Sequence, residues 1–142
     1  LILKKFNIEN SSRFKKILIE KIFKNNKNIK KLEMIIHPLV RKEMKKFSLL
    51  NKNKKTIFYE IPLLIESKLM KYFDIIIFVK AKKKIRLKRF KAKGGEKKLF
   101  DLLDKKQISD AKKIKYCDHV VVNEKNLKIL KKKLSDIISI YA

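Results

Sequence analysis

The sequence is poor in the residues that form disulfides and metal sites. It holds one cysteine, Cys117, and two histidines, His37 and His119, which stand far apart. A single cysteine excludes an internal disulfide, and neither histidine has a cysteine cluster beside it, so we expect no metal site. No apolar run is long enough to span a bilayer, and no secretory signal opens the chain. We therefore expect a cytoplasmic protein without a membrane partner.

Glycine and proline are equally scarce, with two of each among 142 residues. The two glycines, Gly94 and Gly95, are adjacent, and no lysine followed by serine or threonine comes after them. The phosphate-binding loop of P-loop proteins needs spaced glycines and that pair. These residues therefore contain no such loop.

Acidic residues are few, 14 against 40 basic ones, and the formal net charge is +26. Only four of the basic residues are arginine, and lysine occurs in almost every block of ten. Nucleic-acid binding tends to concentrate charge on one face, whereas a coding bias towards A and T spreads lysine evenly. We interpret most of the charge as such a bias. Residues 80–98 are the local exception, with eleven basic residues and one acidic one.

Hydrophobic residues make up 45% of the chain, enough for a folded core. Three apolar runs, at residues 56–61, 74–79 and 119–122, are typical of strands. The second and third do not alternate with polar residues, as expected of parallel strands covered on both faces. A helical pattern follows each run, so the sequence predicts a parallel α/β sheet with crossover helices.

The first fifty-odd residues are typical of helices only, with a break at Asn25-Asn26. We interpret His37-Pro38 as a joint where one helix ends and the next begins, because proline is tolerated in the first turn of a helix. Residues 80–98 form a basic helical region broken at Gly94-Gly95. This region is either a solvated helix face or a cationic flap hinged near the glycines that closes over phosphates.

Several residues fall where ligands bind in open α/β sheets, beyond the carboxyl ends of strands. Glu60 and Pro62 end the first apolar run, and Asn123 closes the third. Each has a plainer interpretation as well. The proline turn can simply end a strand and start a helix, His37 can be a capping or packed side chain, and Asn123 can cap the helix that follows.

Taken in order, these features resemble the dephospho-CoA kinase family. The resemblance runs from about Phe23 onward and rests on a leucine-glutamate pair before a histidine-proline, a proline-leucine-leucine turn with a following glutamate, a basic leucine-x-arginine helix, and spaced glutamine, lysine, aspartate and asparagine residues. The matching residues are Leu32, Glu33, His37, Pro38, Pro62, Leu63, Leu64, Glu66, Leu87, Arg89, Gln107, Lys113, Asp118 and Asn123.

The resemblance implies a P-loop kinase related to nucleoside monophosphate kinases. Such an enzyme uses ATP with Mg²⁺ to phosphorylate the ribose 3′-hydroxyl of dephospho-CoA, the last step of coenzyme A synthesis. It also implies a three-layer parallel sheet of the P-loop kinase type, incomplete here because the strand bearing the loop is missing. Residues 1–142 would form one partial domain: acceptor-binding helices to about residue 54, core strands in 55–79, lid-like basic helices in 80–116, and the last strand and helix in 117–142.

The site residues that the resemblance implies fall into an acceptor group and a nucleotide group. The lid lies in the basic region and Asn123 approaches the adenine. The catalytic residues proper stay unknown, since both the loop and the acceptor-activating aspartate are absent. The acceptor group is His37, Pro38, Glu60, Pro62, Leu63 and Leu64, and the nucleotide group is Arg89, Lys93 and Asn123.

Three departures from the family pattern shape the expectation for activity. Glu60 stands where the family usually has aspartate, and Lys93 stands where the lid commonly has a second arginine. The phosphate loop is expected upstream of Leu1, in a part that was lost in gene prediction or lies on another piece. We therefore expect a kinase fragment that is inactive alone and does not bind ATP tightly.

Two alternatives stay open. One is a non-catalytic remnant that keeps the binding of a CoA-like ligand or of a partner. The other is a basic RNA- or DNA-binding module. The placement of the aromatic residues argues against this module, because they lie inside apolar runs and not between lysines.

Overall fold

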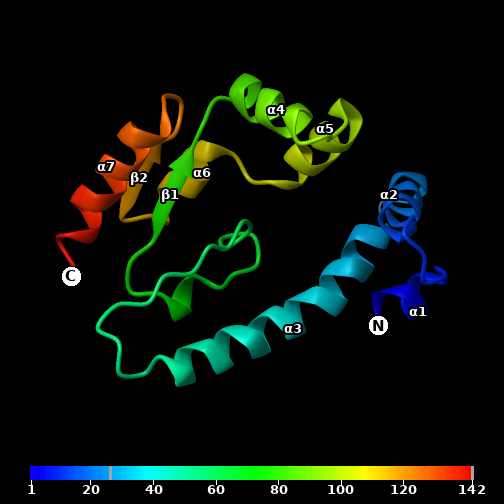
Figure 1. Cartoon of the computed structure of the whole chain (residues 1–142), viewed down its shortest axis with the longest axis horizontal. Coiled ribbons are helices and arrows are strands. Elements are labelled where there is room, and N and C mark those ends of the chain that lie inside the picture. The colour runs from blue at the N-terminus through cyan, green and yellow to red at the C-terminus, as the bar shows by residue number, and fades with distance from the viewer. Residues whose placement is uncertain (26, 142) are drawn as a thin grey trace. The chain divides into compact units, whose positions relative to one another are not determined.

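The computed structural model describes residues 1–25 and 27–141. These residues divide into two compact units, one from Leu1 to Ile57 and one from Phe58 onward. The first unit is helical and the second contains a small parallel sheet with helices (Figure 1).

The first unit consists of α1 (Ile2–Phe6), α2 (Phe14–Lys24) and α3 (Lys27–Leu50). Its core is small: Phe6 and Ile8 are buried beside Ile22 of α2 and Ile29 of α3. The predicted break after α2 is confirmed at Asn25, whose backbone is extended and whose Oδ1 accepts a hydrogen bond from the N–H of Lys27 at 2.9 Å.

The predicted helix joint at His37-Pro38 is wrong, because α3 continues through both residues. A proline inside a helix cannot donate to the carbonyl four residues before it, here that of Met34. Met34 is 76% exposed, so the turn of helix that lacks this bond is not buried. The helix therefore tolerates Pro38 within its 24 residues.

The second unit is built around strands β1 (Ile77–Lys80) and β2 (His119–Val122). They pair in parallel, with Ile77 opposite His119 and Lys80 opposite Val122, which confirms the predicted parallel α/β arrangement. The connection between them contains α4 (Lys83–Ala92), α5 (Lys97–Lys106) and α6 (Asp110–Ile114), and α7 (Leu127–Ile138) follows β2. Val121 of β2 is 2% exposed and lies at the centre of this core.

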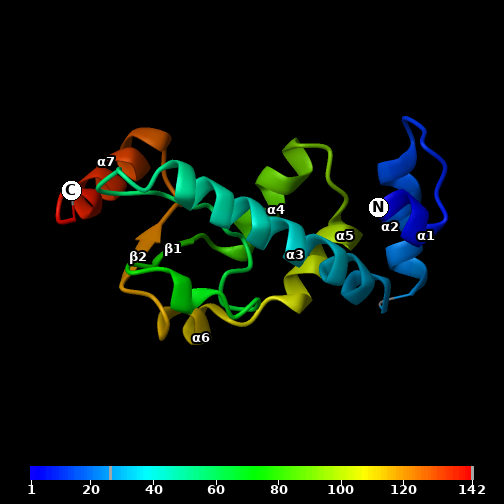
Figure 2. The same cartoon turned by 90° about the horizontal axis from the view of Figure 1, so that it is seen from below.

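Each of the two strands is in contact with a different helix. Helix α6 packs against β1 and α7 against β2, as the view in Figure 2 shows. A 3₁₀-helix, η1 (Met70–Tyr72), precedes β1, and the turn before it buries Leu69.

The strand predicted at residues 56–61 is wrong. These residues form no strand and pair with no other strand in the described chain, whose sheet consists of β1 and β2. A β-strand requires a neighbour for its N–H and C=O groups, and apolar content alone cannot supply one. Phe58 in this segment is 60% exposed, so the segment is not buried between layers.

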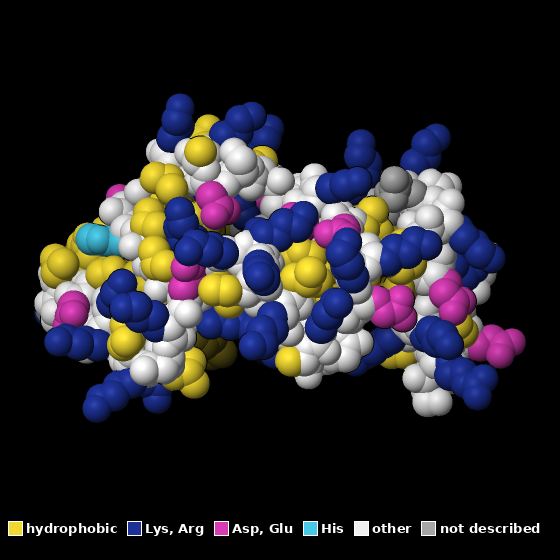
Figure 3. Space-filling model, turned by 90° about the horizontal axis from the view of Figure 1, so that it is seen from above, with side chains coloured by type: hydrophobic (Ala, Val, Ile, Leu, Met, Phe, Trp, Pro, Cys, Tyr) yellow, Lys and Arg dark blue, Asp and Glu magenta, His cyan; other side chains and the backbone are white. Residues whose placement is uncertain are grey.

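The surface carries basic side chains widely. On the face shown in Figure 3, Lys and Arg side chains are scattered, with acidic and apolar side chains between them. No helix within the described residues combines the length and apolar character that crossing a lipid bilayer requires.

Candidate functional site

The carboxyl ends of β1 and β2 form one edge of the second unit. The N–H of Asn123, just after β2, donates to the carbonyl of Lys80, the last residue of β1, at 2.8 Å. Helix α4 starts three residues after β1 ends. This edge is where open parallel sheets bind ligands.

Arg89 and Asn123, two residues of the predicted nucleotide group, meet at this edge. Nη1 of Arg89 on α4 donates to the carbonyl oxygen of Asn123 at 3.0 Å, and the Arg89 side chain is exposed. A guanidinium has five N–H donors, so this bond leaves others for a ligand.

A second contact ties the same loop to the start of α4. Glu124 accepts a hydrogen bond from the N–H of Lys82 at 3.1 Å and forms an ion pair with the Lys82 ammonium at 3.3 Å. The loop after β2 is therefore held by one contact to α4 and by another to the loop after β1.

The remaining residues of the predicted site take no part in the bond between Arg89 and Asn123. Lys93 is exposed at the carboxyl end of α4, directly before Gly94. Glu60 and Pro62 are exposed, and Leu63 and Leu64 are half-buried in the turn before η1. His37 is half-buried and Pro38 is exposed. Both are on α3, in the first unit.

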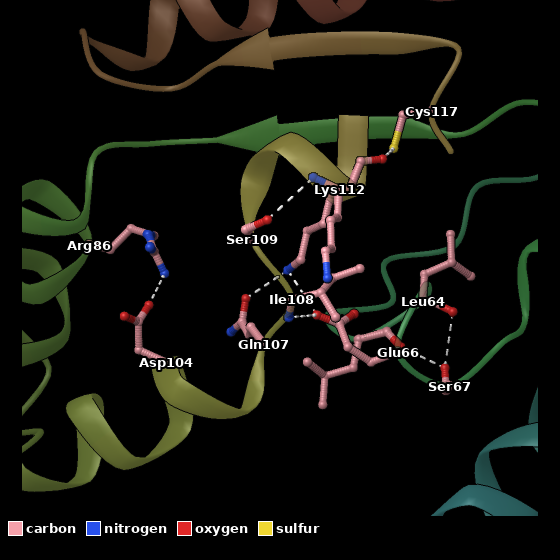
Figure 4. A network of polar contacts seen from close by, with 12 residues as sticks. Leu64, Glu66, Ser67, Arg86, Asp104, Gln107, Ile108, Ser109, Lys112 and Cys117 are labelled. Carbon is pink, nitrogen blue, oxygen red and sulfur yellow. Dashed lines mark hydrogen bonds and ion pairs between the residues drawn. The ribbon is translucent and has the colours of Figure 1, made fainter. Parts of the chain in front are cut away.

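The structure gives Gln107 and Lys113 an internal role. Lys113 on α6 is 6% exposed, and its ammonium donates to Oε1 of Gln107 at 2.8 Å and pairs with Oε1 of Glu66 at 3.1 Å. Figure 4 labels the two partners, Glu66 and Gln107. These three family-pattern residues thus form one polar cluster, here named the Lys113 cluster.

Asp118 also has an internal role, at the amino end of the sheet. Its Oδ2 accepts a hydrogen bond from the N–H of Ile76 at 2.7 Å, and its own N–H donates to the carbonyl of Ile76 at 2.9 Å. These bonds set the register in which β2 enters the sheet beside β1.

Sequence reasoning missed two acidic residues of the lid-like region, Asp101 and Asp104 on α5. Asp104 pairs with Lys83 at 2.9 Å and with Arg86 at 2.7 Å. The hydrogen bond from Lys83 is the main cause that lowers the pKa of Asp104, and the same bond raises the pKa of Lys83. The signal that could have indicated them is that Asp101 and Asp104 are three residues apart, on one face of a helix that follows a basic helix.

The edge does not fit a magnesium site. Mg²⁺ prefers carboxylate and other oxygen ligands, yet the one carboxylate described at the edge, that of Glu124, pairs with Lys82. Over residues 1–25 and 27–141, no three His, Cys, Asp or Glu side chains gather as metal ligands do.

Comparison with known proteins points to one family. A family model described as dephospho-CoA kinase matches residues 9–128. The dephospho-CoA kinase of Protochlamydia amoebophila is 33% identical over 96% of this chain and 70% of its own length. Those of Blochmanniella pennsylvanica and Fusobacterium nucleatum are both 34% identical, over 83% and 89% of this chain. The chain spans 55% and 65% of the lengths of these last two relatives. It belongs to the dephospho-CoA kinase family.

Proposed function

We propose that these residues form the acceptor, lid and adenine-side parts of a dephospho-CoA kinase of the cytoplasm, on an incomplete three-layer P-loop kinase sheet. The proposed reaction transfers the γ-phosphoryl group of ATP to the ribose 3′-hydroxyl of dephospho-CoA. The observation that carries the proposal is the bond from Arg89 to Asn123 at the carboxyl edge of two parallel strands. It joins a lid cation to the loop that family resemblance assigns to the adenine.

Arg89 is the residue best placed to act on phosphate oxygens. Phosphoryl transfer depends on positioning and on neutralising charge that develops on those oxygens. The bond to Asn123 fixes the guanidinium at the edge, while its remaining N–H groups can bind phosphate in bidentate fashion. Lys93, exposed at the end of the same helix, would add a single ammonium.

Within the second unit, we assign acceptor binding to the turn before η1. Glu60 offers an exposed carboxylate, while Leu63 and Leu64 offer half-buried apolar side chains that could contact a nucleoside. His37 and Pro38 on α3 belong to the same acceptor group by family resemblance. These assignments extend the proposal to the substrate dephospho-CoA.

The test joins this chain to the part of the Protochlamydia amoebophila relative that carries the glycine-rich loop expected of the family. ATP-dependent phosphorylation is followed by mass spectrometry of coenzyme A. We expect turnover by the fusion, and a loss of about 100-fold in kcat/KM for Arg89→Ala, because an arginine at the transferring phosphoryl group contributes at least that much.

The matched control is Lys84→Ala, an exposed lysine on the same helix. A folded fusion without turnover, or equal effects of the two variants, would contradict the proposal. Binding of dephospho-CoA without turnover would favour the non-catalytic remnant. Steeply salt-dependent binding of mixed RNA would favour the nucleic-acid module.

A further inference from the structure

The Lys113 cluster joins three separate parts of the second unit. Glu66 comes from the turn before η1 and Gln107 from the end of α5 (Figure 4), and Lys113 belongs to α6. The Lys113 ammonium also lies 5.7 Å from the centre of the Phe78 ring on β1. One side chain thus connects a turn, an interhelical linker and the sheet.

The two charged side chains of the cluster are largely buried and paired with each other, whereas Gln107 is exposed. The side chains of Lys113 and Glu66 are 8% and 15% exposed. Besides Lys113, Oε1 of Glu66 accepts a hydrogen bond from the N–H of Ile108 at 3.2 Å. A charge that leaves water must be paired and hydrogen-bonded, so the position of each partner is fixed by the others.

Glu66 in turn belongs to a hydrogen-bonded turn that carries Leu63 and Leu64. The Ser67 hydroxyl donates to the Leu63 carbonyl at 2.6 Å, and the N–H of Leu69 donates to the Leu64 carbonyl at 3.1 Å. Leu69 is 6% exposed and anchors the far end of the turn. The carboxylate of Glu66 is therefore the polar link from this turn to α6.

We propose that Lys113 is a positioning residue that, through Glu66, sets the turn of residues 62–64 for binding dephospho-CoA. The proposal rests on the function proposed above. Lys113 itself is too deeply buried to touch the substrate. Its removal leaves the Glu66 carboxylate buried without its cation, so the turn must move to reach water.

Hydrogen exchange on the 142-residue chain tests the positioning step without any need for activity. In Lys113→Met, we expect the amides of Ser67, Leu69 and Ile108 to exchange about tenfold faster or more, since their bonds depend on the cluster. The amides of α7 should keep their rates. Lys112→Met, an exposed neighbour on the same helix, is the control and should change none of them.

A double variant keeps the test decisive if Lys113→Met fails to fold. Glu66→Leu with Lys113→Met removes both charges, so no unpaired ion is left and the chain should fold. Its turn amides should still exchange faster than those of the wild type, because the link to Ile108 is gone. Unchanged exchange in the folded double variant would overturn the proposal.

The catalytic readout uses the fusion described above. Lys113→Met or the double variant should raise KM for dephospho-CoA about tenfold and change KM for ATP less than about twofold. Equal changes in both KM values would overturn the proposal. So would an unchanged KM for dephospho-CoA in a variant whose turn amides exchange faster. If the wild-type fusion shows no turnover, the proposed kinase function fails, while hydrogen exchange still decides whether Lys113 positions the turn.

Discussion

Arg86 on α4 and Asp104 on α5 form a 2.7 Å ion pair across the turn that contains Gly94 and Gly95. The rings of Phe90 and Phe100 pack beside it with centroids 5.7 Å apart. The two helices are therefore joined by both polar and apolar contacts. We infer that a closing lid moves as one hairpin and does not bend between its helices at the glycines.

Arg86→Met should lower the stability of this hairpin. Arg86 also donates through Nε to the carbonyl of Ala81 at 3.1 Å, so the variant loses two charge-assisted bonds. We expect a loss of about 1 kcal/mol in the free energy of unfolding, because both groups are partly exposed. Lys84→Met, at an exposed position of α4, should change it by less than about 0.5 kcal/mol. Urea denaturation of both variants measures the difference.

The stabilising effect of Asp104 should depend on pH. Its pKa lies below the usual value because Lys83 and then Arg86 bind its ionised form. A carboxyl whose pKa is lower in the folded chain stabilises it above the unfolded pKa, and this contribution is lost as pH falls through the folded pKa. Asp104→Asn should therefore lower Tm at pH 7, and the difference from wild type should shrink below about pH 4. A difference that stays constant or grows down to about pH 2 would show that the ion pairs are not its source.

The two glycines should respond differently to alanine. Gly94 has a φ of +80° and open space around it, so Gly94→Ala meets backbone strain alone, worth about 1 kcal/mol. At Gly95, a Cβ atom would overlap the Phe90 ring and push it away from Phe100. We expect Gly95→Ala to lower Tm more than Gly94→Ala. The double variant Gly95→Ala with Phe90→Leu should recover part of that loss in Tm. A double variant with no recovery of Tm would contradict this explanation.

The sequence predicted those features that depend on local pattern. The apolar runs that became β1 and β2 have no polar alternation, and the parallel pairing predicted from that is confirmed. The expected cover on both faces is not, because Val79, Val120 and Val122 are 39–45% exposed. The break at Gly94 was equally visible, because two adjacent glycines interrupt a helical pattern. Asn25 ended α2 for a similar local reason.

Features that depend on distant partners were not predictable. Residues 56–61 have the composition of a strand but lack a neighbouring strand in the described chain, and composition does not reveal neighbours. Pro38 stays inside α3 because the carbonyl it leaves unbonded is on an exposed residue, Met34. The cluster of Glu66, Gln107 and Lys113 forms over more than 40 residues of chain, so their spacing could mark them as a family pattern without giving their role.

Substitutions of Lys93 and of Lys97 should have different effects on kcat of the fusion enzyme. Lys97 is bound to Oδ2 of Asp101 at 2.6 Å, one turn along α5, so its charge is already compensated. Lys93 makes no ion pair with any described residue and is exposed at the end of α4. Lys93→Ala should therefore lower kcat more than Lys97→Ala, by about tenfold, if a lid cation neutralises phosphate charge. Similar kcat values for the two variants would remove Lys93 from the proposed site.

The 142-residue polypeptide on its own should show no ATP-dependent phosphorylation of dephospho-CoA. Holding the β- and γ-phosphates in line with the acceptor needs a ring of backbone N–H groups and a lysine from a glycine-rich loop. The only glycines here are Gly94 and Gly95, and they are used in the turn between α4 and α5, where Gly95 donates to the Phe90 carbonyl at 3.0 Å. The cations of the proposed lid, such as Arg89, are single side chains and cannot replace such a loop.

The assay compares the isolated chain with the fusion under the same conditions, after circular dichroism has shown that the helices of the isolated chain are formed. Dephospho-CoA and ATP are supplied at saturating concentration, and coenzyme A is detected by mass spectrometry. We expect product from the fusion alone. Turnover by the isolated chain at a rate near that of the fusion would mean that another part of these residues holds the triphosphate. The edge formed by Asn123 and Arg89 would then be examined first, because α4 of the proposed lid contacts the loop after β2 there.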